Sequence, residues 1–151
     1  MASTYRTKRK KIVDAFVDEL KTNINGTSPY NSNLFNNVSG RVVFLDEISQ
    51  YPKVCVVAGD ETREYQPDGF KWRFLTIEIR AYVEDEEDAQ EELALLLEDI
   101  ERVIDNNDVL TYDDSVSPNL TTTSSTIASV STDEGVLAPL AIGEIILIVR
   151  Y

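Results

Sequence analysis

The residues best suited to chemistry in this sequence are carboxylates, and they form two clusters. Glu84-Asp85-Glu86-Glu87-Asp88 and Asp113-Asp114 carry the oxygen atoms that a hard divalent cation prefers. A run of acids on a helix points its carboxylates in several directions, and the spacing differs from that of a calcium-binding loop. A hydrolase that uses carboxylates would also need them to converge in one pocket. The pattern therefore favours a solvated acidic surface, and we predict no metal site.

Other catalytic residue types are scarce. The sequence has no histidine, which removes the most common general base and metal ligand. The single cysteine, Cys55, lies in an apolar run and is typical of a small buried hydrophobic residue, in keeping with a reducing compartment. Glu78 and Glu144 are the acids within the strongest strand patterns, and we expect them to face solvent or to pair with Arg80 or Arg150. No glycine-rich phosphate loop is present, so we predict no catalytic residue and no cofactor.

The net charge of −13 arises in one segment. Residues 84–114 contain 14 acids and one base, whereas the other 120 residues contain 13 of each. A protein that grips duplex DNA replaces the counterions of the phosphates with Lys and Arg, so this composition argues against that class. No stretch of about 18 apolar residues predicts a membrane span, and the basic N-terminus is not followed by the apolar region of a secretory signal.

An amphipathic helix is predicted near the N-terminus. Ser3 or Thr4 is the expected cap, and the helix should end between Lys21 and Asn25. Its apolar stripe is formed by Ile12, Val13, Phe16, Val17, Leu20 and Ile24. Its first turns hold five bases where the helix dipole disfavours them: Arg6, Lys8, Arg9, Lys10 and Lys11. They form either a solvated tip that offsets acids elsewhere or a docking patch for an acidic partner.

A long polar loop is predicted over residues 25–40, in which Leu34, Phe35 and Val38 either pack on the core or contact a neighbour. Short strands are expected at Arg41–Leu45 and Lys53–Ala58. A turn at 59–61 and a loop or hairpin tip up to Gly69 should follow.

The clearest strand pattern is Lys71–Val83, which alternates strictly between apolar and polar residues beyond Phe74. Glu84-Asp85 should end this strand and cap a second helix over 85–105. The buried stripe of that helix is Ala89, Leu93, Leu96, Leu97, Ile100, Val103 and Ile104.

The C-terminal part predicts a β-hairpin. Residues 111–118 are expected to be irregular, 119–131 to form a strand, 132–135 a turn, and 136–151 the last strand. The apolar run 145–149 is typical of a central strand covered on both faces. We therefore expect a single domain over 1–151 of the α+β class: a mostly antiparallel sheet with two amphipathic helices packed on one face and a C-terminal β-hairpin.

The apolar side chains exceed what two helices on one sheet face can cover. Trp72, Phe74 and Tyr82 lie opposite the core face of the long strand. A second subunit is the simplest cover for such a face, so we expect self-association. The candidate subunit or partner contacts are these three residues together with Leu34 and Phe35.

The order of these motifs resembles a known family. The segments that carry the likeness are Pro52 to Glu61, the strand from Arg73 to Val83, the acidic helix from Asp85 to Asp105, and the closing strand Glu144 to Tyr151. In this order, after an N-terminal amphipathic helix, they resemble the tail terminator (tail completion) proteins of long-tailed bacteriophages. The likeness spans about residues 5 to 151, although the loop 25–40 has no evident equivalent.

The resemblance implies a structural virion protein without enzymatic activity. It implies a ring, usually a hexamer, that caps the head-proximal end of the tail tube at the junction with the neck. Expected partners are other copies of the chain, the tail tube protein, a neck or connector protein, and a sheath protein if the tail is contractile. The protein would be made in the host cytoplasm without contacting a membrane. DNA would pass through the ring without being gripped, since an acidic surface repels phosphates.

Two other functions remain open at this stage. A head–tail connector or neck protein of the same virion has a similar size and class. A metal-dependent hydrolase that uses carboxylates is the more distant alternative, because the sequence lacks histidine.

Overall fold

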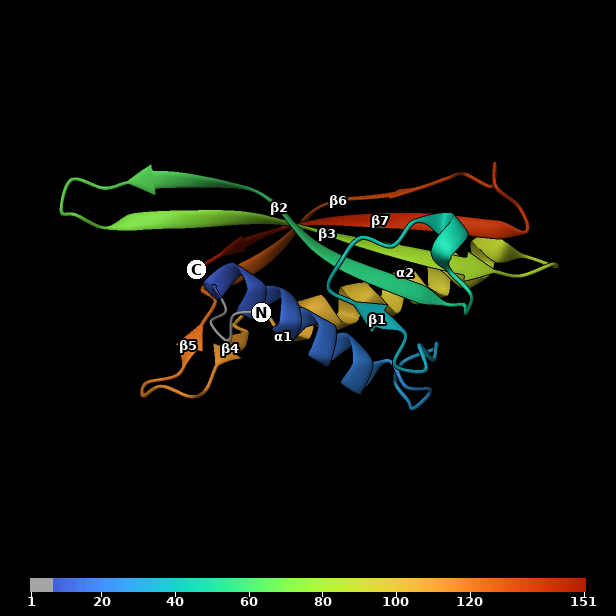
Figure 1. Ribbon diagram of the computed structural model, residues 1–151, viewed down its shortest axis with the longest axis horizontal. Coiled ribbons are helices and arrows are strands. Elements are labelled where there is room, and N and C mark those ends of the chain that lie inside the picture. The colour runs from blue at the N-terminus through green and yellow to red at the C-terminus, as the bar shows by residue number, and fades with distance from the viewer. Residues whose placement is uncertain (1–6) are drawn as a thin grey trace, which may run out of the picture.

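The computed structural model describes residues 7–151 and has the α+β architecture that the sequence predicts (Figure 1). Its elements are α1 (Lys8–Asn23), β1 (Val38–Ser39), the short 3-10 helix η1 (Leu45–Glu47), β2 (Lys53–Tyr65), β3 (Lys71–Glu84), α2 (Ala89–Asn106), β4 (Thr111–Asp113), β5 (Leu120–Thr121), β6 (Ser124–Thr132) and β7 (Leu140–Arg150). Within this part of the chain, no helix is both long and apolar enough to cross a membrane.

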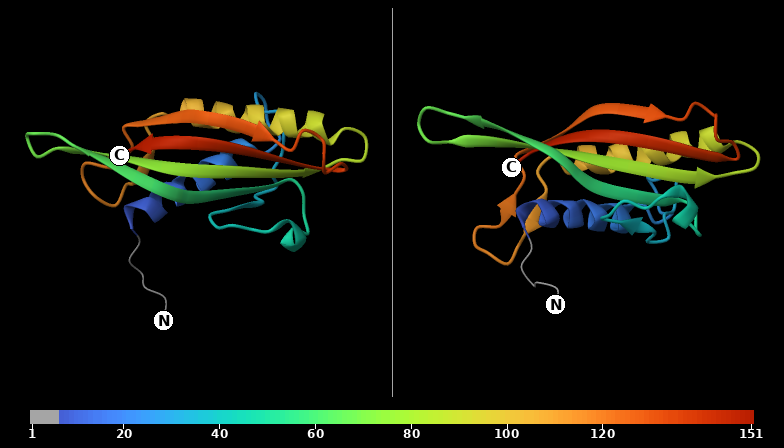
Figure 2. Two further views of the ribbon diagram at one scale, coloured as in Figure 1. Left: turned by 90° about the horizontal axis from the view of Figure 1, so that it is seen from above. Right: turned by 45° about the horizontal axis from the view of Figure 1, so that its top comes forward.

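The main sheet has the strand order β1-β2-β3-β7-β6, in which only the short β1–β2 pair is parallel. Both helices lie on the same face of it (Figure 2). The predicted core faces are confirmed, because alternate residues of β3 from Leu75 to Val83 and the whole apolar stripe of α2 are buried. The close fit of α2 depends on Gly143 of β7, where an added Cβ would lie 2.9 Å from Leu97 Cδ2.

The helix caps differ from the predicted ones. Thr7 caps α1, since its Oγ1 accepts a hydrogen bond from Lys10 N at 3.2 Å; Ser3 and Thr4 lie outside the described residues. Asp88, not Glu84-Asp85, caps α2 by accepting from Glu91 N at 3.1 Å. The earlier position is wrong because β3 continues to Glu84, which pairs with Leu140 of β7.

The region before β3 departs most from the prediction. The predicted strand Arg41–Leu45 does not form. Val43 is buried against Cys55 and Tyr82 on the sheet and Leu45 begins η1, whereas Val42 and Phe44 are exposed. The predicted turn at 59–61 is a β-bulge: Ala58 pairs with Ile77 and Glu61 with Leu75, so β2 holds one extra residue. The strand then continues to Tyr65, and the hairpin tip is at 66–70.

The C-terminal hairpin is present with shifted ends. A turn connects the two strands as predicted, but it spans 133–139 and not 132–135, because β6 includes Thr132 and the last strand begins at Leu140 and not at Val136. Asp133 fixes the intervening loop, because its carboxylate accepts from Leu137 N at 3.1 Å and Ile142 N at 3.2 Å. The predicted irregular region contains the short strand β4, and the predicted strand over 119–131 divides into β5 and β6.

The long loop between α1 and β1 is anchored from α2. Asp99 is fully buried, and its carboxylate accepts from Asn31 N at 3.0 Å and from Ser32 N at 2.7 Å. Leu34 and Val38 are buried in the core, whereas Phe35 remains exposed. The segment predicted as a loop, 25–40, therefore contributes Leu34 and Val38 to the core and one aromatic ring to the surface.

Candidate functional site

The sheet face opposite the helices is covered only in part. The segment 41–51 packs on one end of it, where Val43, Cys55 and Tyr82 form a small buried cluster. Toward the other end, Phe74 and Ile146 are half-buried and Ile148 is 38% exposed. The run 145–149 is in a central strand, as predicted, since β7 lies between β3 and β6. Within the described chain its second face is not fully covered, because Ile148 remains exposed. We call this uncovered region, with Trp72, Phe74, Thr76, Ile146 and Ile148, the open sheet face.

The structure separates the five predicted contact residues. Trp72 and Phe74 lie on the open sheet face with their rings edge to face at 6.4 Å. Tyr82 is buried beneath 41–51, and its hydroxyl donates to Val43 O at 3.3 Å. Burial raises the pKa of Tyr82 above its ordinary value. Leu34 is in the core, so Trp72, Phe74 and Phe35 are the three that reach the surface.

An ion-pair group occupies the centre of the same face. Arg80 pairs with Glu78 at 3.4 Å and with Glu144 at 3.3 Å. This confirms the pairing expected for the two strand acids. Burial lowers the pKa of Arg80, but Glu144, Tyr82 and Glu78 together raise it by more, so that it lies above its ordinary value. Arg80, Glu78 and Glu144 keep this part of the face polar. Their charges are paired with one another, so a catalytic role is not needed to explain them.

The β2–β3 hairpin extends beyond the rest of the molecule at one end (Figure 1). We call its outer part, residues 62–73, the arm. Tyr65 is 70% and Phe70 67% exposed on it. These two rings are not among the contacts predicted from the sequence, although aromatic residues that flank the turn-forming Pro67-Asp68-Gly69 indicate an exposed contact.

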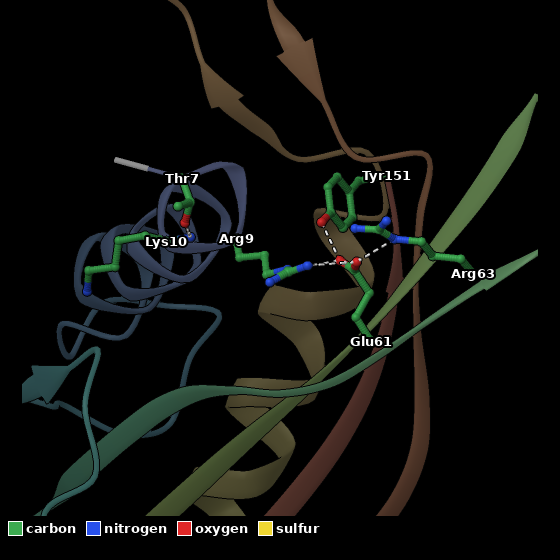
Figure 3. A network of polar contacts seen from close by, with 6 residues as sticks. All are labelled: Thr7, Arg9, Lys10, Glu61, Arg63 and Tyr151. Carbon is green, nitrogen blue, oxygen red and sulfur yellow. Dashed lines mark hydrogen bonds and ion pairs between the residues drawn. The ribbon is translucent and has the colours of Figure 1, made fainter. Parts of the chain in front are cut away.

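Glu61 holds the root of the arm (Figure 3). Its carboxylate accepts from Arg9 at 3.0 and 3.1 Å, from Arg63 at 3.1 Å, and from the Tyr151 hydroxyl. The hydrogen bonds from Arg9 lower the pKa of Glu61 to about 2, although burial acts in the opposite direction. Helix α1, strand β2 and the last residue of the sequence are thus joined at one carboxylate.

The basic cluster of α1 is largely paired within the chain. Besides the Arg9 contact, Lys10 pairs with Asp14 at 3.0 Å and Lys11 with Asp113 at 2.7 Å. The hydrogen bond from Lys11 is the main reason that the pKa of Asp113 falls to about 2. This pairing favours the first of the two predicted roles, in which the bases offset acids of the same chain, over a free docking patch for an acidic partner. Arg6 lies outside the described residues.

The acidic clusters do not converge. Among residues 7–151, no three His, Cys, Asp or Glu side chains are placed to hold a metal ion. Cys55 is buried, and its Sγ accepts a hydrogen bond from the Ser39 hydroxyl at 3.8 Å. It therefore packs as a small hydrophobic residue, as predicted. The notable surfaces of this molecule are therefore the open sheet face and the arm, both of which suit protein contacts.

Comparisons with known proteins agree with this geometry. The family model described as bacteriophage tail tube terminator protein matches residues 6–151. Tail tube terminator protein p142 of Escherichia phage T5 is 41% identical over 150 residues, which cover 95% of this chain and 92% of that protein. A chain from the virion of a native gene transfer agent particle has the same fold, with a TM-score of 0.61, 10% identity and 92% of both chains covered. The chain therefore belongs to the bacteriophage tail tube terminator family, a family of structural virion proteins and not of enzymes.

Proposed function

We propose that six copies of this chain close into a ring that caps the head-proximal end of the tail tube and joins it to the neck. The observation that carries the proposal is the open sheet face, where Phe74, Ile146 and Ile148 keep exposed apolar surface. An apolar surface of this kind is stabilised when a neighbour covers it. Six is the number that the family resemblance implies.

The two borders of the sheet also support a ring. β6 pairs only with β7, and β2 beyond Cys55 pairs only with β3, so both present unpaired backbone groups within the described chain. The two borders belong to different surfaces of one molecule. A contact between unlike surfaces is head-to-tail, and such contacts close into rings when the rotation per subunit permits it.

The acidic surface fits a ring around a passing genome. The exposed face of α2 carries Glu91, Glu98 and Asp105, among other acids. If part of this surface lines the channel, it repels phosphates, and DNA slides past it without being bound.

The test is the size and shape of the purified protein, alone and with tail tubes. Light scattering should find a discrete oligomer near six subunits in at least one of the two conditions, and electron micrographs should show rings with a central hole. Monomers in both conditions would contradict the proposal. Detection of the protein on purified tails that lack heads separates a terminator from a neck protein, which would be absent from them.

A further inference from the structure

The arm ends in a group of side chains that make few contacts within the chain. Phe70 is 67% exposed, and Lys71 beside it forms no ion pair with any described residue. The turn that presents them is well defined: Gln66 N donates to Phe70 O at 2.7 Å, and Gly69 N donates to Gln66 O at 3.2 Å. The tip is thus a fixed protrusion that carries an exposed aromatic ring and a cation at consecutive positions.

A complementary pocket is lined in part by the junction of β3 and α2. This junction lies at the end of the molecule opposite the arm (Figure 1). The pocket has a volume of about 270 Å³. The apolar part of its lining is formed by Phe35, Tyr51, Pro52, Val83 and Leu96, and the acidic part by Glu84, Asp85 and Glu92. Glu84 and Glu92 are exposed and form no ion pair with a described Lys or Arg. We call this the end pocket.

The backbone keeps an aromatic ring exposed at the end pocket. Phe35 has φ of 51° and Asn36 of 61°, a left-handed conformation that bulky side chains rarely adopt. Asn33 holds the turn, because its Oδ1 accepts from Phe35 N at 2.8 Å. As a result Phe35 remains 67% exposed directly after Leu34, which is fully buried. Strain of this type persists where it serves a contact.

The charges of the two sites are opposite. Three acids, Glu84, Asp85 and Glu92, and no base line the end pocket. The arm carries Arg63, Lys71 and Arg73 against Glu64 and Asp68. We infer that the arm of one copy docks in the end pocket of the next, with Phe70 against Phe35 and Lys71 facing Glu84 and Glu92.

This contact is head-to-tail, since the arm and the end pocket lie at opposite ends of the molecule (Figure 2). Because the arm cannot reach the pocket of its own subunit, each copy offers one arm to one neighbour and one pocket to another. Such a contact closes into a ring when the rotation between subunits permits it. The inference rests on the proposed ring and adds the residues that join its subunits. An aromatic anchor beside a paired charge is a common centre of binding energy in protein interfaces.

Charge reversal tests the contact. Lys71→Glu alone and the double variant Glu84→Lys/Glu92→Lys alone should each raise the concentration needed for half-assembly at least about tenfold. The triple variant, with both sides reversed, should return to within about threefold of wild type. Lys8→Glu and Glu91→Lys are matched controls, because they reverse an exposed charge at the same two ends without touching the arm or the end pocket. Thermal unfolding of each variant shows that the monomer fold is intact.

Mixing the two defective variants sharpens the test. Each arm in an equimolar mixture finds its complement on the other variant, so rings should reappear in which the two proteins alternate. Assembly that is as weak in the mixture and in the triple variant as in the single components would overturn the inference. The inference would also be overturned if Lys71→Glu assembled as readily as the wild-type protein. This includes the case in which the variant makes normal rings but no longer binds tail tubes. Either of these results would contradict the contact between arm and end pocket but not the proposed ring. The ring itself would be contradicted if the wild-type protein never assembled.

Discussion

At the scale of single residues, Glu61 shows how one carboxylate can set the direction of a long hairpin. It lies beside the β-bulge of β2, where the arm leaves the body, and it accepts hydrogen bonds from Arg9, Arg63 and Tyr151. Arg73 lies 5.6 Å from the Tyr151 ring and its carbonyl accepts from Tyr151 N, which joins the second strand of the arm to the same group. Any change of charge at Glu61 therefore acts on the arm and on α1 together.

The pH dependence of stability should reveal this contact. Because the pKa of Glu61 is lowered from 4.5 to about 2 in the folded protein, its stabilising effect is complete above about pH 4.5 and is lost as the pH falls toward 2. Wild type should therefore unfold at a higher temperature than Glu61→Gln at pH 7, and the difference should shrink toward zero near pH 2. Thermal melts at low protein concentration measure it. A difference that does not change with pH would show that the charge of Glu61 does not matter.

Asp99 is a second residue whose role depends on burial. Asp99→Ala removes the acceptor of the Asn31 and Ser32 backbone N–H groups, and the free energy of unfolding should fall by about 1.5–3 kcal/mol. Asp105→Ala on the same helix is exposed and should change it by less than about 0.5 kcal/mol. Urea unfolding compares the two. Equal effects would mean that the Asp99 contacts do not anchor the loop.

At the scale of elements, the fit of α2 on the sheet is set by the missing side chain at position 143. A methyl group there would lie 2.9 and 3.1 Å from the terminal carbons of Leu97 and Leu93, which are buried and cannot move away freely. Gly143→Ala should therefore lower the free energy of unfolding by about 1 kcal/mol or more. Gly59→Ala is the matched control, because its nearest neighbour is at an ordinary 3.5 Å. If both variants unfold alike in urea, α2 does not pack as closely as the structure indicates.

At the scale of the whole molecule, one large hydrophobic cluster connects residues from Ile12 to Val149. This continuity supports our proposal that 1–151 is a single domain. The charge is far less evenly spread than the core, since 14 of the 27 acids lie within 84–114.

This charge distribution gives a prediction about DNA. At about 0.15 M salt the wild-type protein should show no retention of duplex DNA in a filter-binding assay, because it offers no surplus of cations to replace the counterions. Replacing exposed acids of α2, such as Glu91 and Glu98, by Gln should raise retention at low salt if that face meets the DNA. Tight binding by wild type would contradict a channel through which DNA slides freely.

Several features were decided by the sequence alone. The alternation in β3 and the apolar stripe of α2 identified the buried residues, because periods of 2 and 3.6 place side chains on one face whatever the neighbours are. The absence of histidine and the acidic segment were enough to argue against catalysis and DNA gripping. The motif order identified the family.

Only the tertiary structure decided the rest. β2 continues through a bulge at Gly59 to Tyr65, and this continuation creates the arm. The bulge depends on pairing with β3, and the local sequence of β2 does not specify that pairing. The same holds for Glu61, whose partners Arg9 and Tyr151 are 52 and 90 positions away in the sequence. Residues 41–44 have strand-forming side chains but pair with no strand, and among them only Val43 is buried against the sheet. Leu34 and Phe35 are neighbours that face opposite ways. Contacts between distant segments select among conformations that are locally almost equal in free energy, so they emerge only when the whole chain is folded.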